Sequence, residues 1–478
     1  MTERIAWFDA LTVRDVPRVG GKNASLGEMV RMLKDKGVRV PDGFATTAAA
    51  FREYVVVNGI EAELRARVEG MKSGRASLHE TGEAVRRLFL DGEFPETMAE
   101  AIKEAYQELS RRSGQSEVSV AVRSSATAED LPQASFAGQQ ETFLNVRGER
   151  ALLDACRRCF ASLFTDRAIS YRETQGFDHL EVALSIGVQR MVRSDLAGSG
   201  VMFSIDTETG FPGVVVISAA WGLGETVVQG AVDPDKYLVF KPLLGDGHYQ
   251  PIIEKTLGAK ETKMIYATGG STRTATVATT QRERQTFVLA DPEILELGRW
   301  AAIIEDHYGR PMDMEWAKDG ETGDLYIVQA RPETVQSSRQ TGRIETYRLK
   351  QKGKPIVTGS AIGEAIASGE VCAIRDAGDI ANFRNGAILV TGMTDPDWVP
   401  IMKRAAGIIT DHGGTTSHAA IVSRELGVPA IVGTGHGTEL LHDGREITLS
   451  CAEGDQGVVY DGILPFEASE VDLSNLPE

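Results

Sequence analysis

The sequence has little cysteine, few aromatic residues and no long apolar run. Four cysteines in 478 residues are too few for the disulfide framework that holds many small secreted domains together. Aromatic residues make up 6% of the chain. No uninterrupted apolar run could span a bilayer, and the N-terminal stretch MTERIAWFDALT lacks the basic start and apolar core of a secretory signal. We therefore expect a cytoplasmic protein that has no membrane partner.

Basic residues are also outnumbered, by 68 Asp and Glu to 51 Lys and Arg, which gives a net charge of −17. This balance argues against general binding to nucleic acid, so a bound nucleotide would have to be held by local basic groups.

Cys156 and Cys159 form a CxxC pair inside the helical pattern LLDACRRCFASLF. Because no second pair accompanies them, core-facing helix residues are favoured over a redox or metal site.

The most informative stretch is AAGIITDHGGTTSHAAIVSRELGVPAIVG, residues 405–433. The apolar run Gly407 to Thr410 predicts a short buried strand, and the hydroxyl residues that follow the glycine loop are typical helix caps. Apolar residues then recur at helical spacing from His418 until Gly427 ends the helix, and a second strand reaches Val432. His418 is therefore expected at a helix N-terminus.

That position favours phosphoryl chemistry at His418. The unpaired N–H groups of a first helical turn attract anions, and their positive field keeps an imidazole neutral and nucleophilic near pH 7. Two other interpretations stay open, a structural histidine and a metal site shared with His412 and Asp411. The spacing of these residues matches no zinc motif, and cysteines are lacking nearby.

Two basic residues in the first part of the chain are candidate phosphate ligands. Lys22 follows the glycine pair of GGKNASLGEMVRMLKDKG, where a helix is expected to start, although a surface lysine is the alternative. Arg123 stands at the end of a strand and leads into a long polar loop with a turn at Phe136-Ala137-Gly138. Such a loop suits nucleotide phosphates, although an ordinary surface loop would have the same composition.

The segments DMEWA and YIVQARPE predict two adjacent strands joined by the turn KDGETGD. Alternation places Asp313, Glu315 and Ala317 on one face of the first strand. Gln329 and Arg331 share a face of the second. A carboxylate and an amide oxygen suit magnesium, and arginine suits a terminal phosphate, whereas a salt-bridged sheet face is the competing interpretation. Glu225, in the weak motif GLGE, is a candidate for a ribose hydroxyl.

Here the sequence resembles a known family. The segment GGTTSHAAIVSR, residues 413–424, resembles the phosphohistidine signature of enzymes that make or use phosphoenolpyruvate. The later SCAEGD resembles the phosphoenolpyruvate synthases (pyruvate, water dikinases) in particular. The resemblance implies that His418 is phosphorylated. It also implies that Lys22 binds the nucleotide and that Arg123 and Arg331 bind its phosphates. Glu315 and Gln329 would be the metal ligands. The strand that borders the adenine would contain Gln189, Met191 and Val192.

The resemblance also implies an α/β architecture. We expect an ATP-grasp-type nucleotide-binding domain at residues 1–335, with lobes at about 1–180 and 181–335, and a polar linker at 336–355. A smaller swivelling β/β/α phosphohistidine domain is expected at 356–466. The tail at 467–478 is expected to lead to a pyruvate-binding barrel that this chain lacks.

The implied function is phosphorylation of His418 by ATP, with Mg²⁺ as the cofactor. The catalytic residues would be Lys22, Arg123, Arg331 and His418 itself. This phosphorylation is the first half of phosphoenolpyruvate synthesis from ATP, pyruvate and water, which also yields AMP and phosphate. Pyruvate and phosphoenolpyruvate would then be partners through the absent barrel. Alternatives are pyruvate, phosphate dikinase, a drug or phenol phosphotransferase, and a non-enzymatic phosphocarrier. The oligomeric state stays open, with a homodimer as one candidate.

Overall fold

The computed structural model describes residues 3–127, 130–131, 134–135, 142–175, 177–179, 181–207, 209–245, 247–267, 274–333, 343–395, 398–415 and 417–472. The chain forms two compact units. The first contains residues Met1–Leu196, Ile265–Ala275 and Met314–Arg331, and the second contains Ala197–Met264, Thr276–Asp313 and Pro332–Glu478. Within the described ranges, no helix is both long and apolar enough to cross a lipid bilayer.

The first unit is built on an antiparallel sheet with the strand order β1-β2-β7-β3-β6. These strands are β1 (Ile5–Trp7), β2 (Gly43–Thr46), β3 (Val120–Ala126), β6 (Thr142–Val146) and β7 (Leu184–Arg190). The short strands β4 (Asp130–Leu131) and β5 (Ala134–Ser135) pair separately. Strand β7 contains Gln189 as expected, but it ends at Arg190, before Met191 and Val192.

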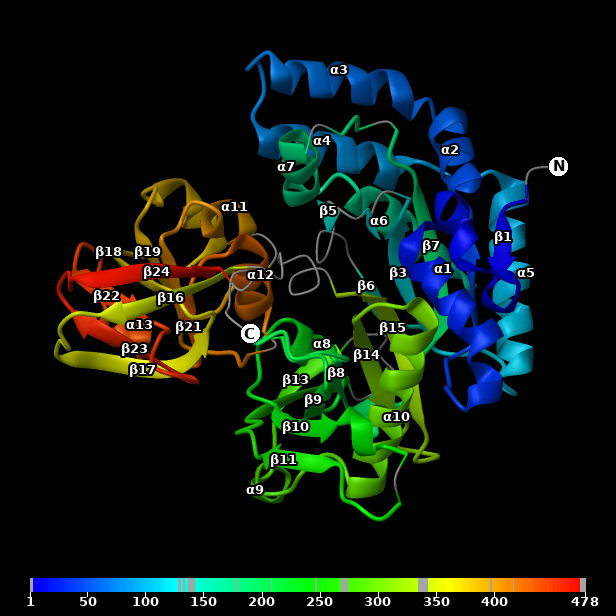
Figure 1. Cartoon of the computed structure of the whole chain (residues 1–478). Coiled ribbons are helices and arrows are strands. Elements are labelled where there is room, and N and C mark those ends of the chain that lie inside the picture. Colours follow the sequence, from blue (N-terminus) through cyan, green and yellow to red (C-terminus); the bar gives the residue numbers. More distant parts are fainter. Residues whose placement is uncertain are drawn as a thin grey trace. The chain divides into compact units, whose positions relative to one another are not determined.

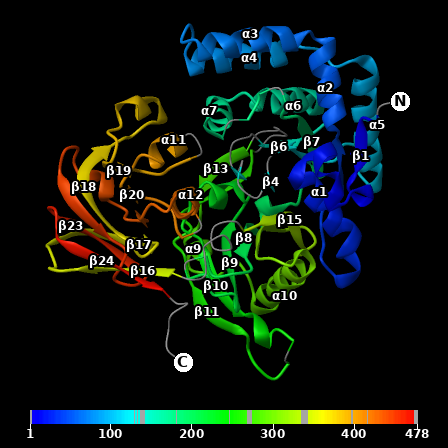
Figure 2. The ribbon, with the colours of Figure 1, turned by 45° about the horizontal axis from the view of Figure 1, so that its top comes forward.

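Helices make up most of the rest of this unit (Figures 1 and 2). They are α1 (Val16–Met32), α2 (Ala48–Val57), α3 (Ile60–Lys72), α4 (Leu78–Asp91), α5 (Glu96–Arg112), α6 (Glu149–Ser162) and α7 (Asp166–Gln175). One apolar core joins the helices α2 to α6 to strands of the sheet. Cys156 and Cys159 are fully buried in α6 within this core, which confirms the interpretation of the CxxC pair as core residues.

The second unit begins with neighbouring strands in the order β11-β10-β9-β8. Their bounds are β8 (Gly198–Phe203), β9 (Val214–Trp221), β10 (Asp235–Phe240) and β11 (Ile252–Thr256). The short helix α8 (Glu225–Val228) follows β9, and α9 (Gln281–Arg284) and α10 (Asp291–Tyr308) come later. Two further pairs of neighbouring strands are β12 (Thr262–Tyr266) with β13 (Thr274–Ala278), and β14 (Met312–Lys318) with β15 (Leu325–Pro332). Most residues of β14 and β15 belong to the first unit.

The C-terminal part of the second unit contains a closed barrel of seven strands. In barrel order these are β17 (Pro355–Ile362), β21 (Ala430–Val432), β20 (Gly407–Thr410), β19 (Ile388–Thr391), β18 (Ile366–Ala373), β22 (Glu446–Ser450) and β23 (Gln456–Asp461). Its helices are α11 (Val399–Met402), α12 (His418–Leu426) and α13 (Gly437–Leu440) (Figure 1). The α/β class is confirmed, and the apolar segments of the sequence became the expected strands.

Two details differ from the expectation. The layered β/β/α arrangement is instead a closed barrel, because β17 pairs with β21 along one edge and with β23 along the other. In addition, β16 (Arg343–Leu349) lies within the segment expected to be a linker, and β24 (Phe466–Asp472) lies in the expected tail. These two strands pair with each other in antiparallel register over their whole length, so distant segments make an ordered ribbon. The predicted domain boundaries themselves stay predictions.

Candidate functional site

Lys22 lies where a glycine bends helix α1. Gly20 has φ 75° and ψ 166°, outside helical values, so the helix effectively restarts just before Lys22. A Cβ on Gly20 would lie 2.3 Å from Ser125 Oγ of β3, so only glycine permits this approach. The Ser125 hydroxyl accepts a hydrogen bond from the Asn23 N–H at 3.3 Å. Lys22 is thus held in a first helical turn beside the end of β3, as the glycine pair predicted.

Strand β15 connects the elements that carry the predicted phosphate ligands. The Arg123 guanidinium donates from Nη1 to the Val328 carbonyl at 3.1 Å. Two residues along β15, the Ala330 carbonyl accepts a hydrogen bond of 2.8 Å from Ser25 Oγ on α1. All of these contacts lie inside the first unit. They bring together the elements that bear Lys22, Arg123, Gln329 and Arg331.

Arg123 retains unused donor capacity. Among the residues that the structure describes, its buried Nε has no hydrogen-bond partner. A buried guanidinium N–H without an acceptor is costly, and a phosphate oxygen is the acceptor that suits its planar fork. An anion would suit this unused donor, and the assignment of Arg123 as a phosphate ligand stays a prediction.

Strands β14 and β15 form the predicted pair of neighbours, joined by the predicted turn. The turn is closed by the Asp319 N–H, which donates to the Asp324 carbonyl at 2.8 Å. Asp313 and Glu315 are half-buried and alternate along β14 with buried Met312 and Met314. The alternation that placed the two carboxylates on one face is confirmed.

Glu315 and Gln329 supply the right atoms for magnesium. A carboxylate and an amide oxygen are hard oxygen ligands, and both side chains are half-buried on neighbouring strands. Within the described ranges, no three His, Cys, Asp or Glu residues cluster in a way that could hold a metal alone. Magnesium commonly takes only one or two protein ligands and completes its shell with water and phosphate oxygens, so this donor set fits magnesium with ATP.

The strand expected to border the adenine contains one unsatisfied amide. Gln189 on β7 is 2% exposed, and its Nε2 has no hydrogen-bond partner among the described residues. The neighbouring main chain is already engaged, because the Met191 N–H donates to the Ser119 carbonyl at 2.9 Å. The Val192 carbonyl likewise accepts from the Ser194 N–H at 2.8 Å. Of the three predicted residues, Gln189 therefore has the clearest capacity for a ligand.

Glu225 belongs to the second unit. It is the first residue of α8, and its carboxylate accepts a hydrogen bond from Gln229 Nε2 at 3.0 Å. This local bond explains the residue without a ribose. Its predicted role in nucleotide binding stays a prediction.

His418 is the first residue of α12, as the spacing predicted. Ser417 is the N-cap, with its Oγ accepting from the Ala420 N–H at 3.3 Å, and Gly427 ends the helix with φ 68°. Thr394 Oγ1 lies 3.0 Å from His418 Nδ1. If Nδ1 carries the proton and donates to Thr394, the lone pair resides on Nε2, which is then the nucleophilic nitrogen.

The competing metal interpretation loses support from Asp411. This carboxylate is buried and accepts hydrogen bonds from Thr434 Oγ1 at 3.0 Å and from the Thr438 N–H at 3.1 Å. It therefore organises the loop after β20 instead of facing a cation. The contact between Thr394 and His418 could not be predicted from the sequence, because a contact across 24 residues has no local signal. The turn predicted at Phe136–Gly138 lies outside the described residues.

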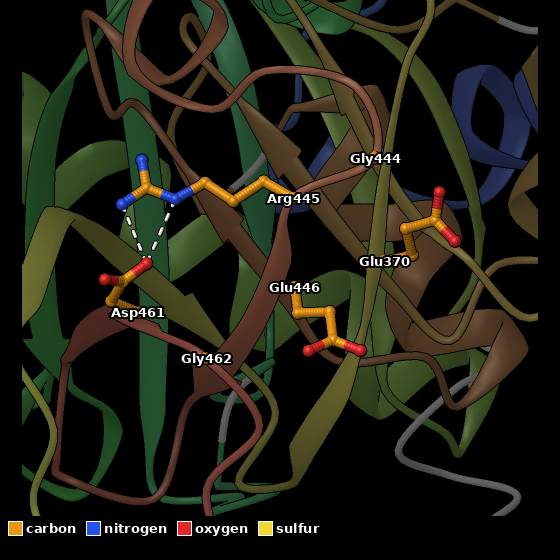
Figure 3. Close-up of a pocket in the computed structure, with 6 residues that line it drawn as sticks. All are labelled: Glu370, Gly444, Arg445, Glu446, Asp461 and Gly462. Atoms are coloured by element: carbon orange, nitrogen blue, oxygen red, sulfur yellow. Dashed lines mark hydrogen bonds and ion pairs between the residues drawn. The ribbon is translucent and has the colours of Figure 1, made fainter.

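An open depression at the opposite end of the barrel contains none of the predicted residues (Figure 3). It is lined by Glu370, Gly444, Arg445, Glu446, Asp461 and Gly462. The strand register places Glu370 next to the start of β19, whereas His418 follows the far end of β20. Arg445 and Asp461 form an ion pair of 2.7 Å across it, which partly neutralises its acidic lining. We assign no role to this depression.

The geometry is that of a two-part α/β protein, with basic groups gathered in one unit and a histidine at a helix N-terminus on a barrel. Comparison with known proteins identifies the family. Residues 16–352 match the family described as "Pyruvate phosphate dikinase, AMP/ATP-binding domain", and residues 383–454 match "PEP-utilising enzyme, mobile domain". The chain belongs to the first of these families, since that match covers more than half of its length.

Curated relatives agree with this assignment. The chain is 55% identical to a phosphoenolpyruvate synthase of Synechocystis over 100% of its own length and 59% of the relative's. It is 51% identical to the synthase of Aquifex aeolicus, covering 99% of this chain and 56% of that one. It is also 51% identical to the synthase of Escherichia coli, covering 99% of this chain and 60% of that one. The chain thus spans less than two thirds of the length of these relatives.

Proposed function

We propose that this chain transfers a phosphoryl group from ATP to His418, as the part of phosphoenolpyruvate synthesis that its two units carry. The observation that carries the proposal is His418 at the N-terminus of α12 with its Nδ1 held by Thr394, in a chain whose larger part belongs to a nucleotide-binding family. The relatives named above are phosphoenolpyruvate synthases, which supports pyruvate as the final acceptor.

In the proposed reaction the first unit binds ATP. Lys22, Arg123 and Arg331 would neutralise the phosphates, and Gln189 would offer its amide to the nucleotide. Glu315 and Gln329 would hold Mg²⁺, which when bound draws charge from the phosphate oxygens during transfer. Hydrogen bonds from Ser25 and from Arg123 to the main chain of β15 support this proposal, because they connect the elements that bear Lys22, Arg123, Gln329 and Arg331.

His418 Nε2 would attack the β-phosphorus of ATP while the bond from that phosphorus to the oxygen of the leaving AMP breaks, and Thr394 would keep the proton on Nδ1. Water would then attack the γ-phosphorus of the pyrophosphoryl group on the histidine, and the bond from the γ-phosphorus to the bridging oxygen would break and release phosphate. In sum, ATP, water and the histidine give phosphohistidine, AMP and phosphate, with the β-phosphoryl group retained on the protein. The amide groups at the start of α12 would then stabilise the added negative charge. Transfer onward to pyruvate would regenerate His418.

The test is intact-mass spectrometry of the chain after incubation with magnesium and ATP, with the nucleotides analysed in parallel. We expect a gain of one phosphoryl group that is lost in acid, together with AMP and phosphate. His418→Ala should abolish the gain while ATP still binds. A phosphoryl gain that persists in His418→Ala, or no gain in the unaltered chain despite ATP binding, would contradict the proposal. Consumption of phosphate would instead indicate a phosphate dikinase.

A second experiment tests the assigned ligands. Arg331→Ala combined with Glu315→Ala should weaken the binding of ATP in magnesium by on the order of a hundredfold, because a charge-assisted pair and a metal ligand are both lost. Isothermal titration with and without magnesium measures this. Arg348→Ala, an arginine on β16 outside the predicted site, is the matched control. Unchanged affinity in the double variant would refute the metal and phosphate assignment.

A further inference from the structure

Helix α12 lies against an apolar surface within its own unit. Ile421, one turn after His418, packs on a buried cluster formed by strands β8 and β9 and by the segment around α8. The cluster consists of Val201, Phe203, Ala220, Val227 and Val232. The helix that carries the histidine is therefore seated on the strands that precede the barrel in sequence, and its first turn has a defined neighbour there.

That neighbour is Gly230, in the turn after α8. Its φ is +69°, and its N–H donates to the Val227 carbonyl at 3.0 Å, which closes the turn. A Cβ at Gly230 would lie 2.4 Å from Ser417 Cβ, 3.1 Å from Ser417 Cα and 3.4 Å from the His418 nitrogen. Ser417 is the N-cap of α12, so any side chain at Gly230 would push directly on the cap that positions His418.

Further close approaches surround this contact. A Cβ on Gly413 would lie 3.3 Å from the Gly230 carbonyl oxygen, and one on Gly414 would lie 3.5 Å from Pro234 Cδ and 3.7 Å from Asp233 Oδ1. The loop before His418 and the segment from Gly230 to Pro234 thus meet through glycines, a serine and a proline. Surfaces of this kind allow backbones to approach closely, and their spacing is sensitive to one added methyl group.

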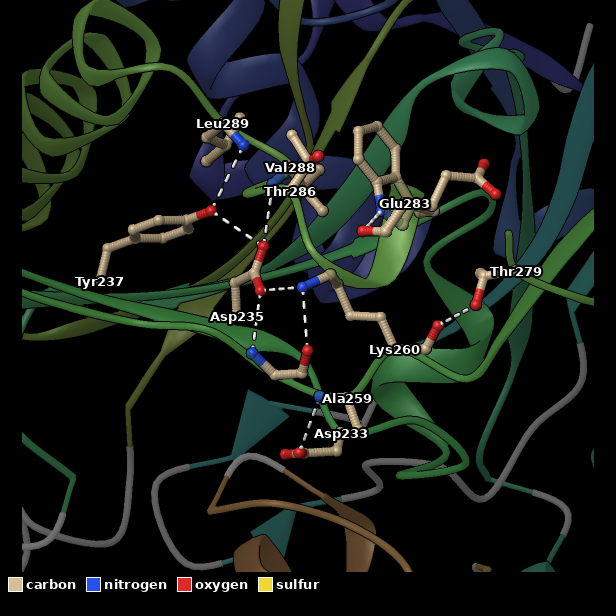
Figure 4. A network of polar contacts seen from close by, with 12 residues as sticks. Asp233, Asp235, Tyr237, Ala259, Lys260, Thr279, Glu283, Thr286, Val288 and Leu289 are labelled. Carbon is tan, nitrogen blue, oxygen red and sulfur yellow. Dashed lines mark hydrogen bonds and ion pairs between the residues drawn. The ribbon is translucent and has the colours of Figure 1, made fainter. Parts of the chain in front are cut away.

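The segment that receives the loop is held by a network of hydrogen bonds around an ion pair (Figure 4). Lys260 is fully buried, forms an ion pair with Asp235 and donates to the Gly258 carbonyl at 3.0 Å. Its backbone N–H donates to the Asp233 carbonyl at 3.0 Å, and the Ala259 N–H donates to Asp233 Oδ2 at 3.1 Å. Asp235 also accepts from the Gly258 and Val288 N–H groups. A buried pair with this many bonds fixes the position of the segment.

We propose that the Gly230 turn is a docking surface for the His418 loop, and that Gly230 is a positioning residue for phosphorylation of the histidine. The inference rests on the proposed function for its kinetic consequence. The glycine lets Ser417 approach the turn, Ile421 anchors the helix on the apolar cluster, and the Lys260–Asp235 pair holds the receiving segment in place. His418 is thereby presented at one fixed depth relative to strands β8 and β9.

The experiment compares two glycine variants. Gly230→Ala should slow the formation of phosphohistidine from ATP by on the order of a hundredfold, since displacement of a reacting group by about 1 Å costs that much. Gly309→Ala is the matched control, because Gly309 also has a positive φ of +65° but a Cβ there would meet nothing within 4 Å. The control shares the backbone strain and lacks the collision, so its rate should stay within about threefold of the unaltered chain.

Two further readouts separate positioning from damage. Titration with ATP should give the same affinity for both variants and the unaltered chain. Phosphoramidate, which phosphorylates histidines without a nucleotide, should label His418 in Gly230→Ala at least as fast as in the unaltered chain. A rate with ATP that is equal in all three proteins, or that falls equally in both variants, would overturn the inference.

Hydrogen exchange tests the docking independently of any reaction. In Gly230→Ala the amides of residues 417–421 should exchange faster than in Gly309→Ala, because the first turn of α12 loses its neighbour. Equal exchange in the two variants would overturn the docking surface even if the chain phosphorylates itself. If docking holds and the unaltered chain forms no phosphohistidine, the proposed function fails and the docking surface stands.

Discussion

Lys22 and His418 occupy the same kind of place in two different regions. Each follows a glycine pair and lies in the first turn of a helix, after a glycine of positive φ, 75° at Gly20 and 105° at Gly413. The regions differ in how the place is completed. Around Lys22 the partners come from β3 and β15, more than a hundred residues away, whereas α12 is capped by the residue before His418.

This difference suggests a division of labour. A helix N-terminus favours anions in either region, and under the proposed function the first would add cations from Lys22, Arg123 and Arg331, which suit steady binding of a charged nucleotide. The second would offer the imidazole of His418, whose neutral form can bond to phosphorus and release it again. Under the proposed function, one region would hold phosphate and the other would accept it temporarily.

The largest effect is expected from replacing Gly20 or Gly413 with alanine, which tests whether the two regions differ in function. Gly20 has ψ 166°, a conformation that is almost restricted to glycine, so Gly20→Ala should cost about 1–3 kcal/mol of folding free energy before any collision. Its Cβ would also strike the Ser125 carbonyl oxygen at 2.4 Å. We expect ATP affinity to fall at least about tenfold, measured by titration, with the unfolding temperature recorded alongside.

Gly413→Ala is the counterpart. Its Cβ would lie 2.8 Å from Ser417 Cβ, so the cap of α12 must shift. Here ATP affinity should be unchanged while phosphohistidine formation slows. Equal loss of ATP affinity in both alanine variants would show that the two regions are not separate in function.

An intermediate effect is expected at Thr394, which has no counterpart near Lys22. Thr394→Val removes the hydroxyl that lies 3.0 Å from His418 Nδ1 and keeps the shape of the side chain. Phosphohistidine formation should slow about fivefold, corresponding to one hydrogen bond of roughly 1 kcal/mol. Thr394→Ser should restore the rate, and the pH dependence of the rate should shift only in the valine variant. A valine variant with an unchanged rate and pH profile would exclude the proposed positioning role.

The smallest effect concerns one buried thiol in each region. Burial raises the pKa of the Cys156 thiol in α6 to about 12, and burial raises that of Cys451 beside the barrel to about 12 as well. At pH 8 the thiolate fraction is then on the order of one in ten thousand, so neither should react with a thiol reagent in the folded chain. Absorbance after addition of an aromatic disulfide measures this, and the unfolded chain is the control. Rapid reaction of one thiol alone would reveal local opening of that region.

Local structure around both sites could be read from the sequence. Gly407–Thr410, His418 at a helix start and Gly427 at its end all follow from glycine, cap and apolar spacing, and the structure has each of them. The pair β14 and β15 was also predictable, because a turn-rich heptapeptide separates two alternating runs.

Contacts between distant segments could not be predicted in this way. Nothing near Ser25 indicates its bond to the Ala330 carbonyl, and nothing near Gly230 indicates that Ser417 will lie against it. Closure of the barrel could not be predicted for the same reason. The alternation of apolar and polar residues along β17 would be the same if it paired with β21 alone or with β23 alone. Periodicity predicts which face a residue occupies, whereas pairing depends on the free energy of the whole assembly.

The closed barrel has one more consequence. An open sheet ends in strands whose N–H and C=O groups invite pairing with other chains, and such edges are frequent starting points of aggregation. The seven barrel strands form a continuous cycle, so each has a neighbour on both sides. A domain that moves between two binding surfaces would benefit from this closure. Its strand N–H and C=O groups stay hydrogen-bonded within the barrel after it leaves either surface.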